Sequence, residues 1–357
     1  MEMTQTHPII DCMAEVFSAD SRRFLLGVSG GVDSMCLLDA SVRALRGVLQ
    51  EREISSRIAV AHVDHGLRDT SKRDAEFVKA YAIEFGLPFF ATRLTKPREG
   101  ENLEAWARRE RYKFFSSVMD KEGYESVLTA HHAGDYLETF LMRILSNKEP
   151  RAIPSFNAHL RILRPLLGFK KTDILSYGEQ FAIPFVEDET NLDTTRLRNL
   201  VRKSLIPLLE EEFGEGVSGR LTDQAASLER ELQALEDISQ SIIHEKLSFS
   251  PFGTRRWLEA LKQVLETIPA PIGERVVKGL FLPFSRSPLG RESAGRLREF
   301  FLSGQVAIQL PGALEVRRRK GGICVSSMIT VANQTRTCEF DEEKSSGYVA
   351  KTDDDCY

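Results

Sequence analysis

The chain has 357 residues, 42% of them hydrophobic and 28% charged, with a formal net charge of −4 at pH 7. These values are typical of a globular protein that is too long for one hydrophobic core, so we expect two or more domains. The sequence contains no apolar run of membrane-spanning length and no signal-peptide pattern at its start, which favours a cytoplasmic protein without a membrane partner.

Charge and cysteine are unevenly distributed along the chain. From Glu339 onward seven acidic residues stand against two lysines, so this tail carries −5 and the first 338 residues carry +1. A near-neutral body leaves room for basic patches that bind RNA. The 5 cysteines are scattered and form no C-x-x-C pair, which argues against disulfides and against a thiolate metal site.

Five apolar runs rich in β-branched and aromatic residues recur in the first part of the chain, and stretches of helical period separate most of them. They lie at 24–28, 57–63, 88–94, 126–130 and 160–167. This alternation predicts an α/β fold with a parallel sheet covered by helices on both faces. Ligands of such sheets bind at the carboxyl ends of the strands.

The rest of the chain reads as mainly helical. Apolar residues at spacings of three and four predict one side of a long helix: Leu221, Ala225, Leu228, Leu232, Leu235, Ile238 and Ile242. A further helical region follows from Ser250, and residues 305–326 predict a hairpin or meander. We therefore expect three parts: a domain at 1–215, a long linker helix with a helical second domain at 216–303, and a small β-containing region at 304–357 with an acidic tail that could be disordered.

The motif SGGVDS at residues 29–34 stands between the first predicted strand and a helix. Its glycines permit close approach of backbone N–H groups to an anion, and the hydroxyl groups of Ser29 and Ser34 add donors at the start of the helix. No lysine follows the glycines, as it does in a Walker loop, so Asp33 could instead hold Mg²⁺ beside bound phosphate. The alternative is an ordinary glycine turn in which Ser34 caps the helix.

This hexapeptide resembles the PP-loop of the N-type ATP pyrophosphatases, which split ATP between its α- and β-phosphates. Four further segments extend the resemblance: AHVDHGLRDTS from Ala61, NLEAWARRERY from Asn102, LTAHHAGDYLETFLMR from Leu128 and VEDETNLDTTRLRNLVRKSLIPLL from Val186. In this order and combination they resemble the tRNA(Ile)-lysidine synthetase family over roughly residues 20–210.

The resemblance implies a Rossmann-like sheet of the adenine nucleotide alpha hydrolase-like type, in a catalytic domain over residues 1–215. It also implies that ATP, with Mg²⁺ held by Asp33, adenylates the C2 oxygen of the wobble cytidine in tRNA(Ile) with a CAU anticodon. Free L-lysine then attacks C2, giving lysidine, AMP and pyrophosphate. The implied ATP-binding residues are Ser29, Gly30, Gly31, Val32, Asp33, Ser34, Ala61, His62, Arg108 and Arg198.

Three side chains after the fourth predicted strand can be read without the resemblance. His131, Asp135 and Glu138 lie four and three residues apart, so they share one face of a helix at the strand end. Two carboxylates there could bind the ammonium group of the substrate lysine, orient it and accept its proton. An ion pair with a nearby arginine and a metal cluster are the alternatives.

Two pairs of arginines have the spacing of one helical face: Arg108 with Arg111, and Arg198 with Arg202. Arginine suits a polyphosphate that is being cleaved, because its planar fork binds two oxygens and stays charged. Solvated faces or ion pairs are the alternative for both pairs. We assign to catalysis Asp33, Asp135, Glu138, Arg111 and Arg202. Side chains just before the second pair would cap a helix or frame the nucleotide: Glu187, Asp188, Asn191 and Asp193.

The sequence departs from the family pattern in two places and meets it again near its end. Gly134 and Tyr136 stand where relatives carry an aspartate and a glutamine, and residues 146–154 replace a glycine-rich connection. The segment QLPGALEVRRRKGG at 309–322 resembles a strand–turn–strand piece of the family's last domain. Its cations would bind tRNA phosphates, with a solvated turn as the alternative: Arg317, Arg318, Arg319 and Lys320.

Other functions are compatible with parts of this pattern. A PP-loop tRNA cytidine 2-thiolase would attack the same C2 atom with sulfur, but that chemistry generally relies on C-x-x-C thiolates, which the sequence lacks. A non-catalytic RNA-binding relative is compatible with Gly134. A small-molecule synthetase would leave the long C-terminal part without an evident use.

Overall fold

The computed structural model describes residues 6–18, 21–64, 66, 71–95, 103–186, 196–285, 289–312, 314–327, 329–331 and 334–336. The chain divides into two compact units. The first comprises Met1–Met142 and Arg151–Ala225, and the second comprises Arg143–Pro150 and Ala226–Tyr357. Each unit has a hydrophobic core of its own.

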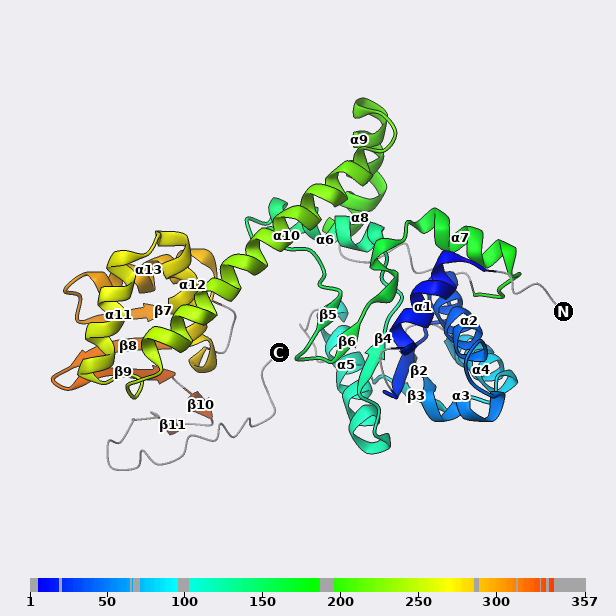
Figure 1. Cartoon of the computed structure of the whole chain (residues 1–357), viewed down its shortest axis with the longest axis horizontal. Helices are drawn as coiled ribbons and strands as arrows, with labels where there is room; N and C mark the ends of the chain where they lie inside the picture. The colour runs from blue at the N-terminus through cyan, green and yellow to red at the C-terminus, as the bar shows by residue number, and fades with distance from the viewer. Residues whose placement is uncertain are drawn as a thin grey trace. The chain divides into compact units, whose positions relative to one another are not determined.

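The first unit is built on a six-stranded sheet with the strand order β3-β2-β1-β4-β6-β5 (Figure 1). Its strands are β1 Phe24–Gly27, β2 Ile58–Asp64, β3 Phe89–Arg93, β4 Ser126–Leu128, β5 Phe156–Asn157 and β6 Ile162–Leu163. All neighbouring strands pair in parallel except β5 and β6, which pair antiparallel at one edge. The predicted Rossmann-like α/β class is therefore confirmed.

The fifth predicted strand is shorter than its apolar run. Of residues 160–167 only β6 is strand, and Pro165 begins the 3₁₀ helix η1 Pro165–Gly168. Proline lacks the N–H group that a sheet ladder needs, so the run cannot continue as a strand. The prediction of a strand through residue 167 was wrong for this reason.

Helices cover both faces of this sheet, because successive strand residues point to opposite sides. Phe24 and Leu26 of β1 enter a core shared with α1, α2, α4 and α7, whereas Leu25 enters a core shared with α5. In Figure 1, α5 lies on one side of the sheet and α1 and α2 lie on the other. The helices of this unit are α1 Pro8–Ser18, α2 Val32–Arg46, α3 Glu51–Arg57, α4 Ser71–Glu84, α5 Leu103–Glu122, α6 Ala133–Leu145, α7 Lys171–Gln180, α8 Arg196–Leu200, the π-helix η3 Val201–Leu205 and α9 Ile206–Phe213.

The predicted long helix is α10 Val217–Ile242, and the chain passes from the first unit to the second within it. The second unit continues with the π-helix η4 Ile243–Leu247, α11 Arg255–Thr267, α12 Ala270–Phe281, the 3₁₀ helix η5 Leu282–Phe284, α13 Arg291–Leu302, β7 Ala307–Leu310, β8 Leu314–Arg319, β9 Gly322–Ser327 and the short strands β10 Ile329–Val331 and β11 Gln334–Arg336. Strands β7, β8 and β9 form the predicted antiparallel meander.

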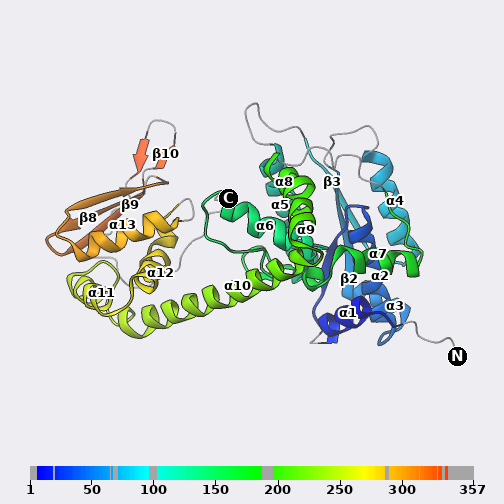
Figure 2. The same cartoon turned by 90° about the horizontal axis from the view of Figure 1, so that it is seen from above.

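The helices and the meander of the second unit share one core. Trp257 of α11, Phe281 of α12, Phe301 of α13 and Val316 of β8 are all buried in it. Figure 2 shows α13 lying against the sheet that contains β8 and β9. Within the described residues, none of the helices of either unit has the length and apolar character needed to cross a membrane.

Candidate active site

The SGGVDS loop lies where the strand order of the sheet reverses. It follows β1, which pairs with β2 on one side and with β4 on the other. The chain moves from β1 towards β3 at one edge and then returns to place β4 on the opposite side of β1. The crevice at such a reversal point, outside the carboxyl ends of the strands, is where open α/β sheets bind ligands.

The loop is shaped by Gly30 and Ser34. Gly30 has φ +98°, a conformation that side-chain-bearing residues rarely adopt. The hydroxyl oxygen of Ser34 accepts hydrogen bonds from the backbone N–H groups of Ser29 and Gly30, at 3.1 and 3.2 Å, and the hydroxyl donates to the carbonyl of Gly31. Gly31 is the N-cap of α2, so the alternative in which Ser34 caps the helix is wrong.

The N–H groups available to an anion are those at the first turn of α2. Among the described residues, the N–H groups of Val32 and Asp33 have no hydrogen-bond partner. They lie at the positive end of the helix dipole. This geometry suits a phosphate group.

Asp33 forms an ion pair that the sequence does not predict. Its Oδ1 atom lies 2.5 Å from Nζ of Lys171, the first residue of α7. The two residues are 138 positions apart, and no motif links them in the sequence. The described residues contain no group of three His, Cys, Asp or Glu side chains that could hold a metal ion. A single carboxylate nevertheless fits Mg²⁺, which proteins often bind through one or two carboxylates together with substrate phosphates.

Ala61 and His62 support the loop from the neighbouring strand. The carbonyl of Ala61 accepts the N–H of Val28 at 2.9 Å. His62 is buried, and its Nδ1 atom lies 2.9 Å from the carbonyl oxygen of Val28. Burial lowers the pKa of His62, so the ring is neutral and its Nδ1–H donates this bond. Contact of either residue with ATP stays a prediction.

Four predicted site residues meet in one charged cluster, which we call the carboxylate–arginine cluster: Asp135, Glu138, Arg198 and Arg202. Glu138 is only 3% exposed. Its two oxygens accept from Nε of Arg202 at 2.5 Å and from Nε of Arg198 at 3.0 Å. The arginines contact Asp135 at longer distances, with Oδ1 at 3.3 Å from Arg202 and 3.7 Å from Arg198, and its Oδ2 accepts the backbone N–H of His132 at 3.1 Å.

The cluster lies close enough to the loop for the charge of Asp33 to act on Arg202. Burial alone would lower the pKa of Arg202, but the pKa is raised because Glu138, Asp135 and Asp33 surround the guanidinium with negative charge. The arginine pair therefore neutralises carboxylates in this structure. Its contact with ATP phosphates stays a prediction.

His131 lies in the connection between β4 and α6, which begins at Ala133, so the prediction that it shares a helical face with Asp135 and Glu138 was wrong. One of its ring nitrogens, Nδ1, lies 3.0 Å from the hydroxyl of Thr129. Burial lowers the pKa of His131 to about 4, against the opposing effect of Asp135. Burial also raises the pKa of Asp135, but the neighbouring His132 and His131, when protonated, together with the backbone N–H of His132 and the charge of Arg198, outweigh it and hold that pKa below its ordinary value. At neutral pH the pair is therefore a neutral imidazole and a carboxylate.

His132 is a site residue that the sequence pattern does not single out. It is buried, and its Nε2 atom lies 3.6 Å from Oδ2 of Asp135. Its Nδ1 atom accepts the N–H of Gly134 at 3.0 Å. A β-carbon at Gly134 would lie 2.7 Å from Cε1 of His132, so the glycine at this position lets the ring fold over the backbone. Any side chain at position 134, including the aspartate of relatives, would collide with the ring of His132 in this conformation.

Of the first arginine pair on α5, Arg108 acts on His131, and a role of Arg111 in catalysis stays a prediction. Arg108 stacks on Tyr112, with its guanidinium carbon 5.0 Å from the ring centroid, and its charge helps to lower the pKa of His131. Arg111 is half-buried in the same helix. Arg164, at the end of β6, was missed; it is 3% exposed and its charge also acts on His131. The sequence could have indicated Arg164, because it is a charged residue within the apolar run at residues 160–167.

The basic run of the second unit is engaged locally. Arg318 donates to the carbonyls of Phe300, Phe301, Ser303 and Gln305 and stacks over the ring of Phe300. Arg317 pairs with Glu315 on the same strand at 2.6 Å. Arg319 and Lys320 are exposed at the turn between β8 and β9. Their contact with tRNA stays a prediction.

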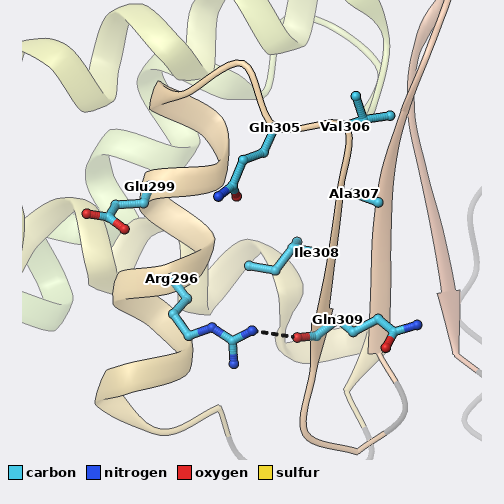
Figure 3. A pocket seen from close by; sticks show the side chains of 7 residues that line it. All are labelled: Arg296, Glu299, Gln305, Val306, Ala307, Ile308 and Gln309. Carbon is cyan, nitrogen blue, oxygen red and sulfur yellow. Dashed lines mark hydrogen bonds between the residues drawn. The ribbon is translucent and has the colours of Figure 1, made fainter.

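A groove of about 580 Å³ in the second unit lies between α13 and the edge strand β7 (Figure 3). Arg296, Glu299 and residues 305–309 line it. Arg296 already donates to the carbonyl of Gln309 at 3.0 Å. Among these lining residues, Glu299 is the only carboxylate and there is no nucleophilic side chain.

Some predicted features lie outside the described residues. They are the nucleotide-framing side chains Glu187, Asp188, Asn191 and Asp193, and the acidic tail from Glu339.

Comparison with known proteins agrees with the position of the loop. The PP-loop domain family matches residues 4–209. The tRNA(Ile)-lysidine synthase of Enterococcus faecalis is 35% identical over 256 residues, which cover 69% of this chain and 52% of that protein. The enzyme of the same name from Thermus thermophilus is 33% identical over 303 residues, covering 84% of this chain and 55% of that protein. The chain thus spans about half the length of these relatives.

A solved structure supports the same fold. The U34-tRNA thiolase from Methanococcus maripaludis, determined with its [4Fe-4S] cluster, superposes with a TM-score of 0.50 over 62% of this chain and 79% of that one. At 12% sequence identity this likeness concerns the fold alone. The family match over more than half of the chain, with its glycine loop at the reversal point of a parallel sheet, shows that the chain belongs to the PP-loop domain family.

Proposed function

We propose that the chain is a cytoplasmic ligase that joins free L-lysine to C2 of the wobble cytidine of tRNA(Ile) with a CAU anticodon. ATP would adenylate the C2 oxygen with release of pyrophosphate, and the lysine ε-amine would then displace AMP. The observation that carries this proposal is that the PP-loop and the carboxylates of Asp135 and Glu138 follow two neighbouring parallel strands, β1 and β4, at the same end of the sheet. The similarity to tRNA(Ile)-lysidine synthases supports the choice of substrate.

The nucleotide half of the reaction rests on the first turn of α2. The N–H groups of Val32 and Asp33 would bind phosphate oxygens, and the Asp33 carboxylate would hold Mg²⁺ together with those phosphates. The bound ion would supply positive charge to the phosphates during cleavage. Ser29, Gly30 and Ser34 keep the loop in shape through the hydroxyl of Ser34.

The lysine half rests on Asp135. Glu138 already accepts three hydrogen bonds from the two arginines, at 2.5 to 3.0 Å, whereas the contacts of Asp135 with the same arginines are 3.3 and 3.7 Å. Because its pKa is lowered, Asp135 is ionised at neutral pH and can bind an ammonium group. Glu138 would fix the arginines, and Asp135 would orient the attacking amine.

The test is incubation of the protein with ATP, Mg²⁺ and labelled lysine, with and without tRNA(Ile) bearing a CAU anticodon. We expect label in the tRNA and AMP release only when all components are present. AMP release without lysine incorporation would redirect the assignment to another tRNA modification. No ATP turnover with tRNA would favour a non-catalytic RNA-binding relative.

A further inference from the structure

The nucleotide loop of this chain lacks a lysine in sequence but has one in space. Lys171 places its Nζ atom 2.5 Å from the Asp33 carboxylate, beside the N–H groups at the start of α2. Its side chain is 43% exposed and that of Asp33 is 31% exposed, so both can be reached by a ligand in solution.

Helix α7 is fixed to α2 in a way that determines where Lys171 lies. The hydroxyl of Tyr177 donates to the buried carboxylate of Asp39 at 2.5 Å. Burial raises the pKa of the Cys36 thiol to about 12, so the thiol stays protonated and donates to the carbonyl of Ile174 at 3.6 Å. A β-carbon at Gly178 would lie in ordinary van der Waals contact with Sγ of Cys36 at 3.4 Å, so α7 and α2 pack closely at this point.

The start of α7 is also held. The Asp173 carboxylate accepts the backbone N–H of Lys170 at 2.7 Å, which closes the first turn and presents Lys171 to the loop. Contacts along α7 other than the ion pair with Asp33 therefore hold the backbone of Lys171 in place.

We propose that Lys171 is the phosphate-binding cation of the nucleotide loop. Without nucleotide it neutralises Asp33. When Asp33 engages Mg²⁺ with ATP, the ammonium group exchanges its carboxylate partner for an oxygen of the β- or γ-phosphate. The inference rests on the proposed use of ATP at this loop and adds a residue from α7 to it.

The physical reason is charge balance. An Asp33 carboxylate alone would repel the phosphates of ATP, and the N–H groups of the loop carry only partial charges. A lysine ammonium acts as a compact point charge for phosphate, as it does in Walker loops, where the lysine belongs to the loop itself. Here the same charge comes from a helix 138 residues downstream.

The experiment compares binding of ATP and of AMP by calorimetry, because AMP lacks the β- and γ-phosphates. Lys171→Met should weaken binding of Mg²⁺-ATP about ten- to a hundredfold, the range for a hydrogen bond to a charged group, and leave AMP binding unchanged. Lys171→Arg should restore most of the affinity. Lys170→Met is the matched control, since it removes an adjacent, exposed lysine, and should change neither affinity.

ATP binding measured without metal, in EDTA, tests whether Lys171 exchanges Asp33 for a phosphate oxygen. Asp33→Asn should bind ATP more tightly than the unaltered protein, because Lys171 is released, and adding Lys171→Met should abolish this gain. Equal loss of ATP and AMP binding in Lys171→Met, or unchanged ATP binding, would overturn the inference. Lysine incorporation into tRNA is read separately, so ATP binding that depends on Lys171 without lysidine formation would reject only the proposed function. Failure of the unaltered protein to bind ATP would reject both.

Discussion

The charged residues at the carboxyl ends of β1 and β4 and those of the C-terminal meander differ in how far along the chain their ion-pair partners lie. At these strand ends, Asp33 pairs with Lys171 and Glu138 with Arg202, over separations of 138 and 64 residues. In the meander, Arg317 pairs with Glu315 on the same strand, and Arg318 binds carbonyls 13 to 18 residues away. In the first region a ligand could take the place of a partner from a distant segment, whereas in the meander local pairing holds a strand and the end of α13.

This comparison suggests that the first unit holds its charges ready for exchange and the second uses them for its own stability. The exposure of Lys171 and Asp33, 43% and 31% for their side chains, is consistent with exchange at the loop. The following substitutions test the contrast in order of decreasing effect.

Asp33→Asn should leave the fold intact and lower tRNA-dependent ATP–pyrophosphate exchange by about a thousandfold, because a metal and its phosphates lose several kcal/mol of charge stabilisation. The half-exposed ion pair with Lys171 contributes about 1 kcal/mol or less to stability. Asp120→Asn is the control, since Asp120 also pairs with a basic residue, Arg161, but lies on the surface. Retention of full exchange activity in Asp33→Asn would remove the assigned role.

Glu138→Ala should lower the free energy of unfolding by about 3 kcal/mol, because two arginines lose a buried partner; their partial exposure places the cost at the low end for a buried pair. Glu315→Ala, which breaks a local pair in the meander, should cost about 1 kcal/mol or less. Urea denaturation measures both. Equal costs would contradict the difference between the two regions.

Asp135→Asn should slow the second step while leaving adenylation of tRNA largely unchanged. Loss of one carboxylate from an ammonium site costs about 1.5–3 kcal/mol, which raises the lysine concentration needed by about one to two decades. Lysine-dependent AMP release gives this value, and pyrophosphate release gives the first step. A defect limited to ATP binding would instead place Asp135 in the nucleotide pocket.

Acid should destabilise the first unit through His131. Its pKa is about 4 in the folded protein and about 6.5 when unfolded, so between these values only the unfolded state takes up the proton. Stability therefore falls as the pH drops from 6.5 towards 4, by up to about 1.4 kcal/mol per pH unit. His131→Asn should flatten this dependence in urea titrations. Burial also lowers the pKa of His62, so a smaller slope should persist.

In the meander, Arg318→Ala should lower the free energy of unfolding by about 1–2 kcal/mol, because carbonyls near the end of α13 lose their donor. Urea denaturation measures this change.

Arg317→Ala combined with Lys320→Ala tests the predicted tRNA contact. We expect a severalfold loss of tRNA affinity and a salt slope smaller by about one per lost contact, with ATP affinity unchanged. An unchanged salt slope would leave this turn with a structural role only.

The sequence determined the features that depend on local pattern. Alternating apolar runs and helical periods predict the α/β class, and glycines at fixed spacing predict the loop after β1, because backbone geometry and burial act over a few residues. The face shared by Asp135 and Glu138 follows from helical spacing alone. The run at 160–167 misled because Pro165 outweighs its apolar character.

Only the tertiary structure decided which charges meet. Lys171 reaches Asp33 because α7 packs on α2 through Tyr177 and Cys36, and no spacing in the chain encodes that contact. The same holds for the arginines that face Asp135 and Glu138, and for His132, which folds over Gly134. Pairing between distant side chains depends on how helices pack on a sheet, which is a property of the whole core and not of any one segment.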